Sequence, residues 1–516
     1  QQLEACVSKG GAEWQPVEGS LFIVRVFARH LPHNEESVVA SLLGMYARLP
    51  EHHRIRQIFT KCIGAFGKWL NGHPQYLGAL LDYVVKGLGM PKEQGGLVAA
   101  EALQDLCDDC SEHMASPQQL QGMMQIYGNI DSLEASLRDK IVQGLGSILL
   151  RIEPQQLTGM LESLVQTPVE MGTTCLARSD KDGAMAQIQK LRTLMKGGHV
   201  ASDGRQDAES AAQREALGAA WAHCFQRVWP LLEGVIVSHG EDENLMENMC
   251  RCIRSAVQIM GLRFRDYLGP FATAAVNAFL KKPLSCILYA VTTVVSAFGR
   301  HPEFVQPLTE MIAALSTRTF QVFGSGEAFS NSPDIVTEYF EMLDRANIRF
   351  PQVVLTTPLG DNACACAVSS LYTNLEHREA LQATLKFIHG LCHRDLSREL
   401  VCPFLQAQSA GPCGRGTQAR GLTFWNAIFQ TLVSKPSFLL ETIASVVHDM
   451  AHFLPNESRE WATAALQQVP ETTLEAKHKE DFMRSLQQAL ASPMENQQRL
   501  IMQALRGLFR GVKKPA

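Results

Sequence analysis

Two stretches of the chain, SPQQLQGM at residues 116–123 and EPQQLTGM at residues 153–160, repeat almost the same eight-residue pattern. Their prolines, Pro117 and Pro154, lie 37 residues apart, and Pro74 precedes the first of them by 43 residues. Proline has a fixed φ and no amide hydrogen, so it suits the first turn of a helix. A recurrence near 40 residues, with a helix start in each copy, indicates a repeat protein built from pairs of helices.

Turns of the same kind recur along the chain. Each has a proline directly before a new apolar segment, as in HPQYL at residues 73–77, HPEFV at 301–305 and KPSFL at 435–439. One pair of helices cannot bury its own apolar stripe, whereas stacked pairs bury a continuous core, so such an array can exceed the size of an ordinary domain. The alternative is a set of unrelated helical bundles, which the five similar turns disfavour.

Apolar residues follow a helical period almost everywhere. In residues Arg54–Leu70 they recur at every third or fourth position, which places them on one face of a helix. No stretch alternates apolar and polar residues over the length of a strand between hairpin turns. We therefore predict an all-α fold, a HEAT-repeat (armadillo-like) right-handed α-solenoid over residues 1–516 with about 11–12 helix pairs. Four further segments share the period: Tyr76–Leu88, Val98–Cys110, Leu133–Leu150 and Phe304–Phe323.

Three polar segments interrupt this pattern and are predicted to lie outside the helices. Residues 197–213 (GGHVASDGRQDAESAAQ) are polar and contain glycine, which predicts a mobile loop. Residues 406–421 (QAQSAGPCGRGTQARG) form a second predicted loop, which carries Arg415 and Arg420. A Gly/Ser connector is predicted over residues 324–334. Long loops in a compact fold are often functional or disordered, but the residue types here indicate no mechanism.

The composition excludes several classes of protein. Hydrophobic residues make up 46% and charged residues 19%, so the chain is not globally disordered. A formal net charge of −5 argues against a general nucleic-acid binder and a basic membrane-surface protein. The longest apolar run, Leu284–Phe298, is interrupted by serine and threonine and is shorter than the about 20 residues that a bilayer span needs. The 14 cysteines lack paired spacing, which predicts thiols in a cytosolic or nuclear protein.

The sequence lacks the signatures of catalysis and of cofactor binding. It contains no GxGxxG opening a helix after a strand, no GxxxxGK[ST], no HExxH and no GxSxG. The best metal candidate, Cys107 and Cys110 with His113, supplies three ligands where a structural zinc ion needs four. In a helical pattern, cysteine behaves instead as a small buried hydrophobic residue. We therefore predict no catalytic residue, no cofactor and no metal ligand.

The segment Asp242–Met260 (DENLMENMCRCIRSAVQIM) separates clearly into two faces. Arg251 and Arg254 lie three positions apart on the polar face, so their guanidinium groups emerge side by side. Two such groups can bind a phosphate or a carboxylate with paired hydrogen bonds. The alternative is that Glu247 pairs with Arg251 on a solvated face, where such a pair contributes about 0.3–0.5 kcal/mol. The predicted apolar face is Leu245, Met246, Met249, Cys252, Ile253, Ala256, Val257 and Met260, and the predicted polar face is Asn244, Glu247, Asn248, Arg251, Arg254, Ser255 and Gln258.

Several stretches, taken together in their order and spacing, resemble the importin-β (karyopherin) superfamily. Within it, they are similar to the transportin-SR group, carriers that import serine/arginine-rich (SR) splicing factors. The resemblance extends through nearly the whole chain, as the carboxy-terminal half or somewhat more of such a carrier. The stretches are GSLFI at residues 19–23, HPQYL at 73–77, VWPLL at 228–232, CRCIR at 250–254, TFQVF at 319–323 and MQALRGLFR at 502–510.

This resemblance implies a HEAT-repeat superhelix without catalytic activity. Carriers of this kind hold cargo on the concave face, cross the nuclear pore by contacting Phe-Gly repeats of nucleoporins, and release cargo when Ran-GTP binds. The implied cargo is SR-type splicing or RNA-binding proteins, with shuttling between cytoplasm and nucleus, no direct nucleic-acid contact and no membrane insertion. The amino-terminal repeats that mainly contact Ran are expected to be missing from this chain, which starts with Gln1 rather than methionine.

The resemblance also implies where cargo binds. An arginine-rich helix of the family faces phosphorylated Arg-Ser dipeptides of the cargo, and residues 244–258 match that helix. Arg251 and Arg254 fall on family arginines, whereas amide side chains such as Asn244 stand where further arginines are expected. This departure leaves open whether cargo binding depends on phosphate. The predicted cargo-binding residues are Arg251, Arg254, Gln258 and Asn248.

Two other functions stay open at this point. The chain is alternatively a HEAT-repeat scaffold for another protein complex, such as a phosphatase or trafficking assembly, or an all-helical enzyme. Binding of Ran-GTP and Phe-Gly peptides distinguishes a carrier from a scaffold. A bound metal ion or a deep polar pocket would favour an enzyme.

Overall fold

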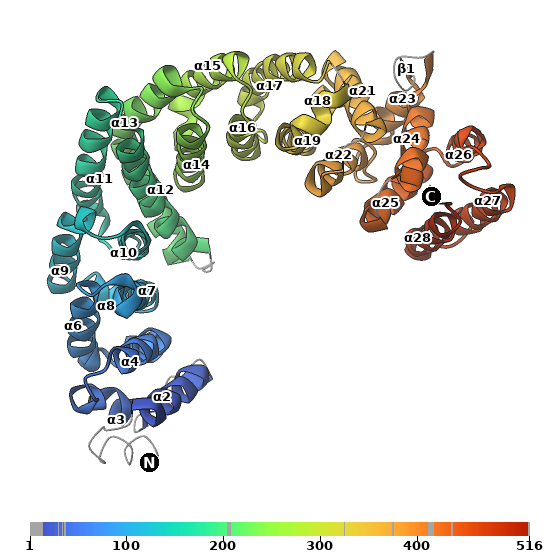
Figure 1. The fold of residues 1–516 in the computed structure, drawn as a ribbon. Helices are drawn as coiled ribbons and strands as arrows, with labels where there is room; N and C mark the ends of the chain where they lie inside the picture. The colour runs from blue at the N-terminus through green and yellow to red at the C-terminus, as the bar shows by residue number, and fades with distance from the viewer. Residues whose placement is uncertain are drawn as a thin grey trace. The chain divides into compact units, whose positions relative to one another are not determined.

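The computed structural model describes residues 14–28, 30–32, 35, 38–203, 208–324, 326–373, 376–410, 417–434 and 437–513. The chain divides into two compact units. The first consists of Gln1–Val235 with Arg251–Arg265, and the second of Ile236–Cys250 with Asp266–Ala516. Helices dominate both units, which confirms the predicted all-α class (Figure 1).

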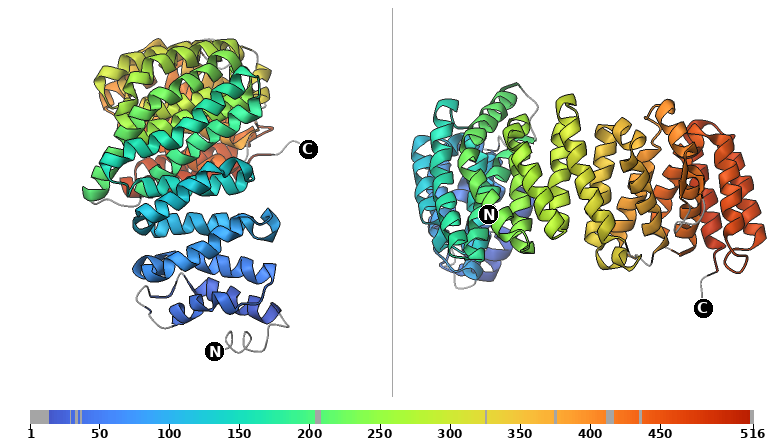
Figure 2. Two further views of the ribbon diagram at one scale, coloured as in Figure 1. Left: turned by 90° about the vertical axis from the view of Figure 1, so that its left-hand side faces the viewer. Right: turned by 90° about the horizontal axis from the view of Figure 1, so that it is seen from above.

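In the first unit, helices lie in two layers, which Figure 1 shows in blue and green; the left view of Figure 2 shows the same helices stacked one above the next. In one layer each helix packs on the next: α2 (Trp14–Ala28), α4 (His53–Ala65), α7 (Gly96–Asp109), α10 (Ala135–Leu149) and α12 (Lys181–Asp203). The other layer includes α6 (Leu77–Leu88), α9 (Pro117–Gly128) and α11 (Pro154–Ala177). The remaining helices are α3 (Val38–Gly44), α5 (Gly67–Gly72), α8 (Ser111–Met114) and parts of α13 (Ala208–His239) and α14 (Glu243–Met260).

The second unit repeats this arrangement. One layer runs from α16 (Ser285–Phe298) through α19 (Pro333–Arg349), α22 (Arg378–Leu391) and α25 (Leu440–Phe453) to α28 (Met494–Arg510). The other includes α17 (Pro302–Val322), α21 (Pro358–Tyr372), α24 (Arg420–Ser434) and α26 (Pro455–Gln468). The other elements include the parts of α13 and α14 within Ile236–Cys250, α15 (Arg265–Lys281), α18 (Gly326–Asn331), α20 (Pro351–Thr356), α23 (Arg398–Gln406), α27 (Ala476–Leu490) and the strands β1 (Gln408–Ala410) and β2 (Thr417–Ala419).

The core of each unit lies between its layers and between successive helices of one layer. In the second unit, Phe340 of α19 and Phe387 of α22 are fully buried, and their rings stack with centroids 5.6 Å apart. Burying one such side chain stabilises the fold by about 1.5–3 kcal/mol. Because each apolar stripe is covered by the next helix along, the unit holds together through contacts between neighbours.

The predicted role of proline is confirmed at three helices. Pro117, Pro154 and Pro302 occupy the first turn of α9, α11 and α17. Pro74 opens a 3-10 turn instead, directly before α6. Pro436 lies outside the described residues.

The single helix predicted over residues 54–70 is wrong, because the helix breaks at Phe66 between α4 and α5. The apolar period continues through the break, so the sequence pattern does not reveal it. At Gly67, the first residue of α5, a methyl group would lie 2.6 Å from an oxygen of Asp109. The glycine therefore lets α5 approach α7 closely.

Most of the loop predicted over residues 197–213 is helical. Helices α12 and α13 extend into it from both sides, and residues 204–207 between them lie outside the described residues. Gly197, which suggested a loop, lies where α12 packs on α10. A methyl group there would come within 2.3 Å of the carbonyl oxygen of Gln143, so glycine allows close packing at this point.

We expect Gly197→Ala to lower the free energy of unfolding by about 1–3 kcal/mol, because the added methyl group overlaps backbone atoms that have little freedom to move. The measurement is thermal denaturation followed by circular dichroism. Gly122→Ala is the matched control, since no side chain or neighbouring helix of the described residues lies within 4 Å of the position of its added methyl group. The control should be neutral or gain up to about 1 kcal/mol from helix propensity. Equal melting temperatures for Gly197→Ala and the unaltered chain would contradict the packing role.

The second predicted loop, residues 406–421, contains a short antiparallel hairpin. Strands β1 and β2 pair with Ser409 opposite Gln418, while residues 411–416, which include Arg415, lie outside the described residues. The predicted connector over 324–334 likewise contains the helix α18.

Arg420, predicted to lie in the second loop, begins α24 and is only 3% exposed. It donates a hydrogen bond to the carbonyl oxygen of Phe404 at 2.8 Å, pairs with Asp361, and places its guanidinium group 4.0 Å over the ring of Phe404. Its contacts join α21, α23 and α24. Arg420 is therefore a packing residue and not part of an exposed arginine surface.

Candidate functional site

Helix α14 has the two faces that its sequence predicts. All eight residues of the predicted apolar face are buried: Leu245, Met246, Met249, Cys252, Ile253, Ala256, Val257 and Met260. The helix starts where the carboxylate of Asp242 accepts a hydrogen bond from the amide of Leu245 at 3.1 Å. A carboxylate at this end satisfies a free amide and favours the helix dipole.

The polar face of α14 presents three of the four predicted cargo-binding residues to solvent. Arg251, Arg254 and Gln258 are exposed and belong to the first unit. Asn248 is half-buried, and its side-chain oxygen accepts no hydrogen bond from the described residues. Ser255, predicted on the same face, is buried and donates a hydrogen bond to the carbonyl oxygen of Arg251 at 3.2 Å. The prediction that Ser255 lies on the polar face was therefore wrong. Its hydroxyl can be buried because this hydrogen bond satisfies it within the helix.

A further arginine, which the sequence analysis missed, lies on the neighbouring α12. Burial raises the pKa of the Cys252 thiol to about 12, and the positive charge of Arg192 partly offsets this rise. The positive charge of Arg192 acts on Cys252 of α14 and also on Asp139 of α10. The periodicity of α12 gives no sign of this, because the proximity depends on how two helices pack.

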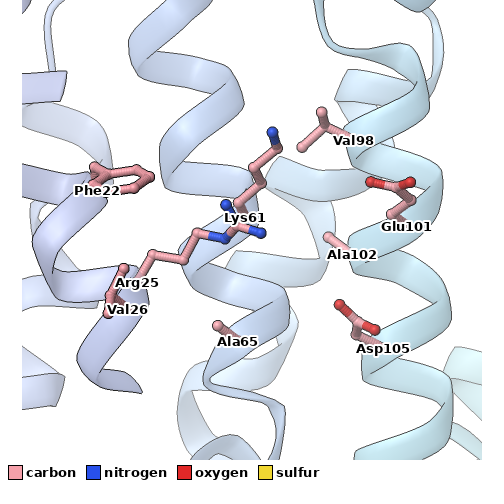
Figure 3. A pocket seen from close by; sticks show the side chains of 9 residues that line it. All are labelled: Phe22, Arg25, Val26, Lys61, Ala65, Val98, Glu101, Ala102 and Asp105. Carbon is pink, nitrogen blue, oxygen red and sulfur yellow. The ribbon is translucent and has the colours of Figure 1, made fainter. Parts of the chain in front are cut away.

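A cavity of about 360 Å³ lies among α2, α4 and α7 of the first unit (Figure 3). Arg25 and Lys61 line it from α2 and α4, and Glu101 and Asp105 face them from α7. Phe22 is 54% exposed and forms part of an apolar rim. Two cations and two anions leave this lining without a preferred charge of ligand.

The second unit contains a larger polar cavity of about 620 Å³ among α19, α22 and α25. Its charged lining is Glu341, Glu379, Glu441 and Lys386, so carboxylates outnumber cations; we call it the acidic cavity. Lys386 lies 3.0 Å from Glu341 and 3.3 Å from Asp344. Burial opposes the charge of Lys386, but these carboxylates outweigh burial and raise its pKa.

The acidic cavity was not predicted from the sequence. Its glutamates are ordinary polar-face residues of three separate helices, and Glu379 and Glu441 are exposed. The one available signal is the return of glutamate to the polar faces of successive repeats. Such a cavity can bind a cationic side chain, for which arginine is well suited because its planar group forms paired hydrogen bonds with carboxylates.

The cysteines considered as metal ligands are part of the packing. Cys107 and Cys110 are buried, and burial raises the pKa of the Cys110 thiol to about 12. That thiol donates a hydrogen bond to the carbonyl oxygen of Gly67 at 3.2 Å. The ring nitrogen Nε2 of His113 is hydrogen-bonded to the carbonyl oxygen of Asn71 at 2.9 Å.

Among the described helices, none has the length and apolar character that a membrane span requires.

Two family models match the chain. The model of the third TPR domain of transportin-3/importin-13 matches residues 36–126, and that of the fourth matches residues 221–323. The second of these ranges includes α14. The resemblance to the importin-β superfamily is thereby confirmed.

Three curated proteins are similar to this chain over 69% to 94% of its length. Transportin MOS14 of Arabidopsis thaliana is 22% identical over 506 residues, which are 94% of this chain and 49% of the relative. An uncharacterized protein of Schizosaccharomyces pombe is 24% identical over 390 residues, which are 73% of this chain and 39% of the relative. Human importin-13 is 20% identical over 374 residues, which are 69% of this chain and 38% of the relative. The chain thus spans half or less of the length of these relatives.

Solved structures show the same fold. Importin-13 in its cytosolic state superposes with a TM-score of 0.77 at 15% identity, over 98% of this chain and 56% of that chain. Importin beta superposes with a TM-score of 0.54 at 12% identity, over 98% of this chain and 60% of that chain. These likenesses confirm the predicted helical-repeat fold. The relatives belong to a class of transport receptors and not of enzymes, in agreement with the predicted lack of catalysis.

Proposed function

This chain is a member of the importin-β superfamily and contains repeat domains of the transportin-3/importin-13 type, and from that membership we propose that it acts as a nuclear transport receptor. The proposed cargo is SR-type splicing or RNA-binding proteins, recognised through segments rich in arginine and phosphorylated serine. Ran-GTP and Phe-Gly nucleoporins are the proposed partners, with shuttling between cytoplasm and nucleus.

The observation that supports this cargo class is the exposed pair Arg251 and Arg254 on α14. A phosphoserine carries a charge of about −1.5 to −2 and three strong acceptor oxygens. Guanidinium groups bind such oxygens in pairs and remain charged at every physiological pH. A cargo segment of this kind is disordered when free, so its affinity comes from many modest contacts.

The acidic cavity supports the same cargo class from the second unit. The arginines that alternate with phosphoserine in such a segment are matched in charge to Glu379 and Glu441. Each unit therefore offers a surface for one of the two kinds of charge in the cargo.

The test of the function is a fluorescence anisotropy titration of the chain with labelled Arg-Ser repeat peptides, phosphorylated and unphosphorylated. We expect both peptides to bind, the phosphorylated one more tightly, and both to weaken as salt is raised, because exposed charges are screened. A Phe-Gly peptide should bind independently of either. If none of the three peptides binds, the scaffold alternative replaces the receptor.

Reversing the charge of the acidic cavity tests its share of the binding. We expect Glu379→Lys with Glu441→Lys to weaken Arg-Ser peptide binding about 5–30-fold, since each exposed ion pair contributes about 0.2–1 kcal/mol and reversal adds repulsion. Glu471→Lys with Glu495→Lys is the matched control, because both residues are exposed and do not line the cavity. Equal weakening by the two double variants would attribute the effect to net charge and remove the cavity from the proposal.

A further inference from the structure

Three side chains that ordinarily bind transition metals meet in the second unit, beside the acidic cavity, whose lining includes His389. His389, His393 and Asp449 each offer a ligand atom, and these atoms all lie within 4.8 Å of one another. His389 is in the last turn of α22, His393 follows the end of that helix, and Asp449 is on α25. Figure 1 shows α22 and α25 as neighbouring helices. We propose that this His-His-Asp cluster binds a divalent transition-metal ion, with Zn²⁺ as the best match.

The distances within the cluster suit one shared ion. The Nε2 atom of His389 lies 3.0 Å from Oδ2 of Asp449, and the rings of His389 and His393 have centroids 5.2 Å apart. Zinc lies about 2.0–2.2 Å from nitrogen and oxygen ligands, so two ligands of a tetrahedral site are a little over 3 Å apart. All three ligand atoms lie within 4.8 Å of one another, so the binding of an ion requires them to move closer by rotation of the side chains.

Asp449 is held in place before any ion binds. Its side chain is 5% exposed, and its Oδ1 accepts a hydrogen bond from Nδ1 of His448 at 2.8 Å. The backbone amide of Arg394 donates to Oδ2 at 3.3 Å. Oδ2 is thus the oxygen that faces His389, while His448 fixes the other oxygen.

The ring of His393 is held from outside the cluster. Its Nδ1 accepts a hydrogen bond from the backbone amide of Asp395 at 3.3 Å. This bond helps to fix the orientation of the ring next to His389 and Asp449.

The ligand types select the ion. Two imidazoles with one carboxylate favour zinc, and also cobalt, nickel and copper, over calcium and magnesium, which prefer oxygen ligands. The side chains of His389 and His393 are 25% and 39% exposed, so an ion can enter and a water molecule can complete a four-coordinate shell. The bound ion would tie the end of α22 to α25.

The cluster could not be identified from the sequence, which predicted no metal ligand. His389 and His393 are four positions apart, but His393 lies beyond the end of its helix, and Asp449 follows His389 by 60 residues. Only the packing of α22 on α25 brings the three together.

The test titrates Zn²⁺ into the chelator-treated full chain against a coloured competing chelator. We expect one zinc site that His393→Gln weakens by more than about tenfold. His452→Gln, an exposed histidine of α25 outside the cluster, is the matched control and should leave the site unchanged. Zn²⁺ should also raise the melting temperature of the unaltered chain and of His452→Gln, but not of His393→Gln.

Co²⁺ provides an independent readout, because its visible spectrum reports a four-coordinate site with nitrogen and oxygen ligands. We expect that spectrum with the unaltered chain and its loss in His393→Gln, with circular dichroism showing that the variant is folded. Equal zinc affinity and stoichiometry in His393→Gln and the unaltered chain would overturn the proposal. A cobalt spectrum that is the same in both would overturn it as well.

Discussion

Reversing both charges of the exposed arginine pair, Arg251→Glu with Arg254→Glu, should weaken binding of a phosphorylated Arg-Ser peptide about 10–100-fold. Each arginine loses charge-assisted hydrogen bonds to phosphate, and each new glutamate repels it. Two such changes correspond to about 1.5–3 kcal/mol of binding free energy at the surface. The measurement is the dissociation constant from fluorescence anisotropy at fixed ionic strength.

Three controls make this result specific. Arg251→Lys with Arg254→Lys keeps the charge and loses the planar fork, so it should give a smaller loss. Arg499→Glu with Arg506→Glu changes the net charge by the same amount on exposed positions of α28. The unphosphorylated peptide should be affected less than the phosphorylated one. An unaltered dissociation constant in the Arg251/Arg254 charge-reversal variant, with an unchanged circular dichroism spectrum, would remove the site assignment.

The fold was largely predictable because its strongest signals are local. A helix buries one apolar face, and the residues of that face recur three and four positions apart in the sequence, as in Leu245, Met249 and Cys252 of α14. Proline at the first turn is also local, so the starts of α9, α11 and α17 could be read directly.

Errors arose where a residue acts across two helices. Gly197 lies in a segment with the composition of a loop, yet it permits α12 to approach α10. Arg420 also lies in a segment with the composition of a loop, yet its partners Phe404 and Asp361 bury it. In both cases the decisive contact is with a residue far away in the sequence, which one chain read by itself does not reveal.

The candidate sites divide in the same way. Arg251 and Arg254 share one helix face, so their spacing alone places them together. The acidic cavity draws its glutamates from α19, α22 and α25, and the His-His-Asp cluster joins α22 to α25. Surfaces made by one helix were therefore predictable, and surfaces made by stacked helices were not.

Removing the partner of a buried lysine should give the largest loss of stability in the first unit. Lys190 on α12 is 2% exposed, and its ammonium group lies 2.6 Å and 2.9 Å from the two carboxylate oxygens of Asp131. Arg138 lies 3.8 Å from the same carboxylate. Asp131→Ala leaves a buried cation without this partner, and we expect a loss of about 3 kcal/mol, because Asp131 is half-exposed and water replaces part of the interaction.

The matched control replaces Lys190 by an uncharged residue, so the buried side chain no longer needs an ionic partner. Lys190→Met keeps the length of the side chain in an apolar surrounding and should cost less than about 1.5 kcal/mol. Because the chain has two units and need not unfold in one step, hydrogen exchange of the α12 amides is the suitable measurement. Equal protection of α12 in Asp131→Ala and the unaltered chain would contradict the proposed dependence.

The pH dependence of stability gives a second test of the interaction between Lys190 and Asp131. Burial, only partly opposed by Asp131, lowers the pKa of Lys190 below its ordinary value. Between the lowered folded pKa and the unfolded value of about 10.4, the unfolded chain binds more protons, so stability rises with pH. Asp131→Ala lowers the folded pKa further and should therefore regain stability as the pH rises from neutral toward about 10. Asp131→Ala combined with Lys190→Met has no lysine to neutralise and should show no such recovery.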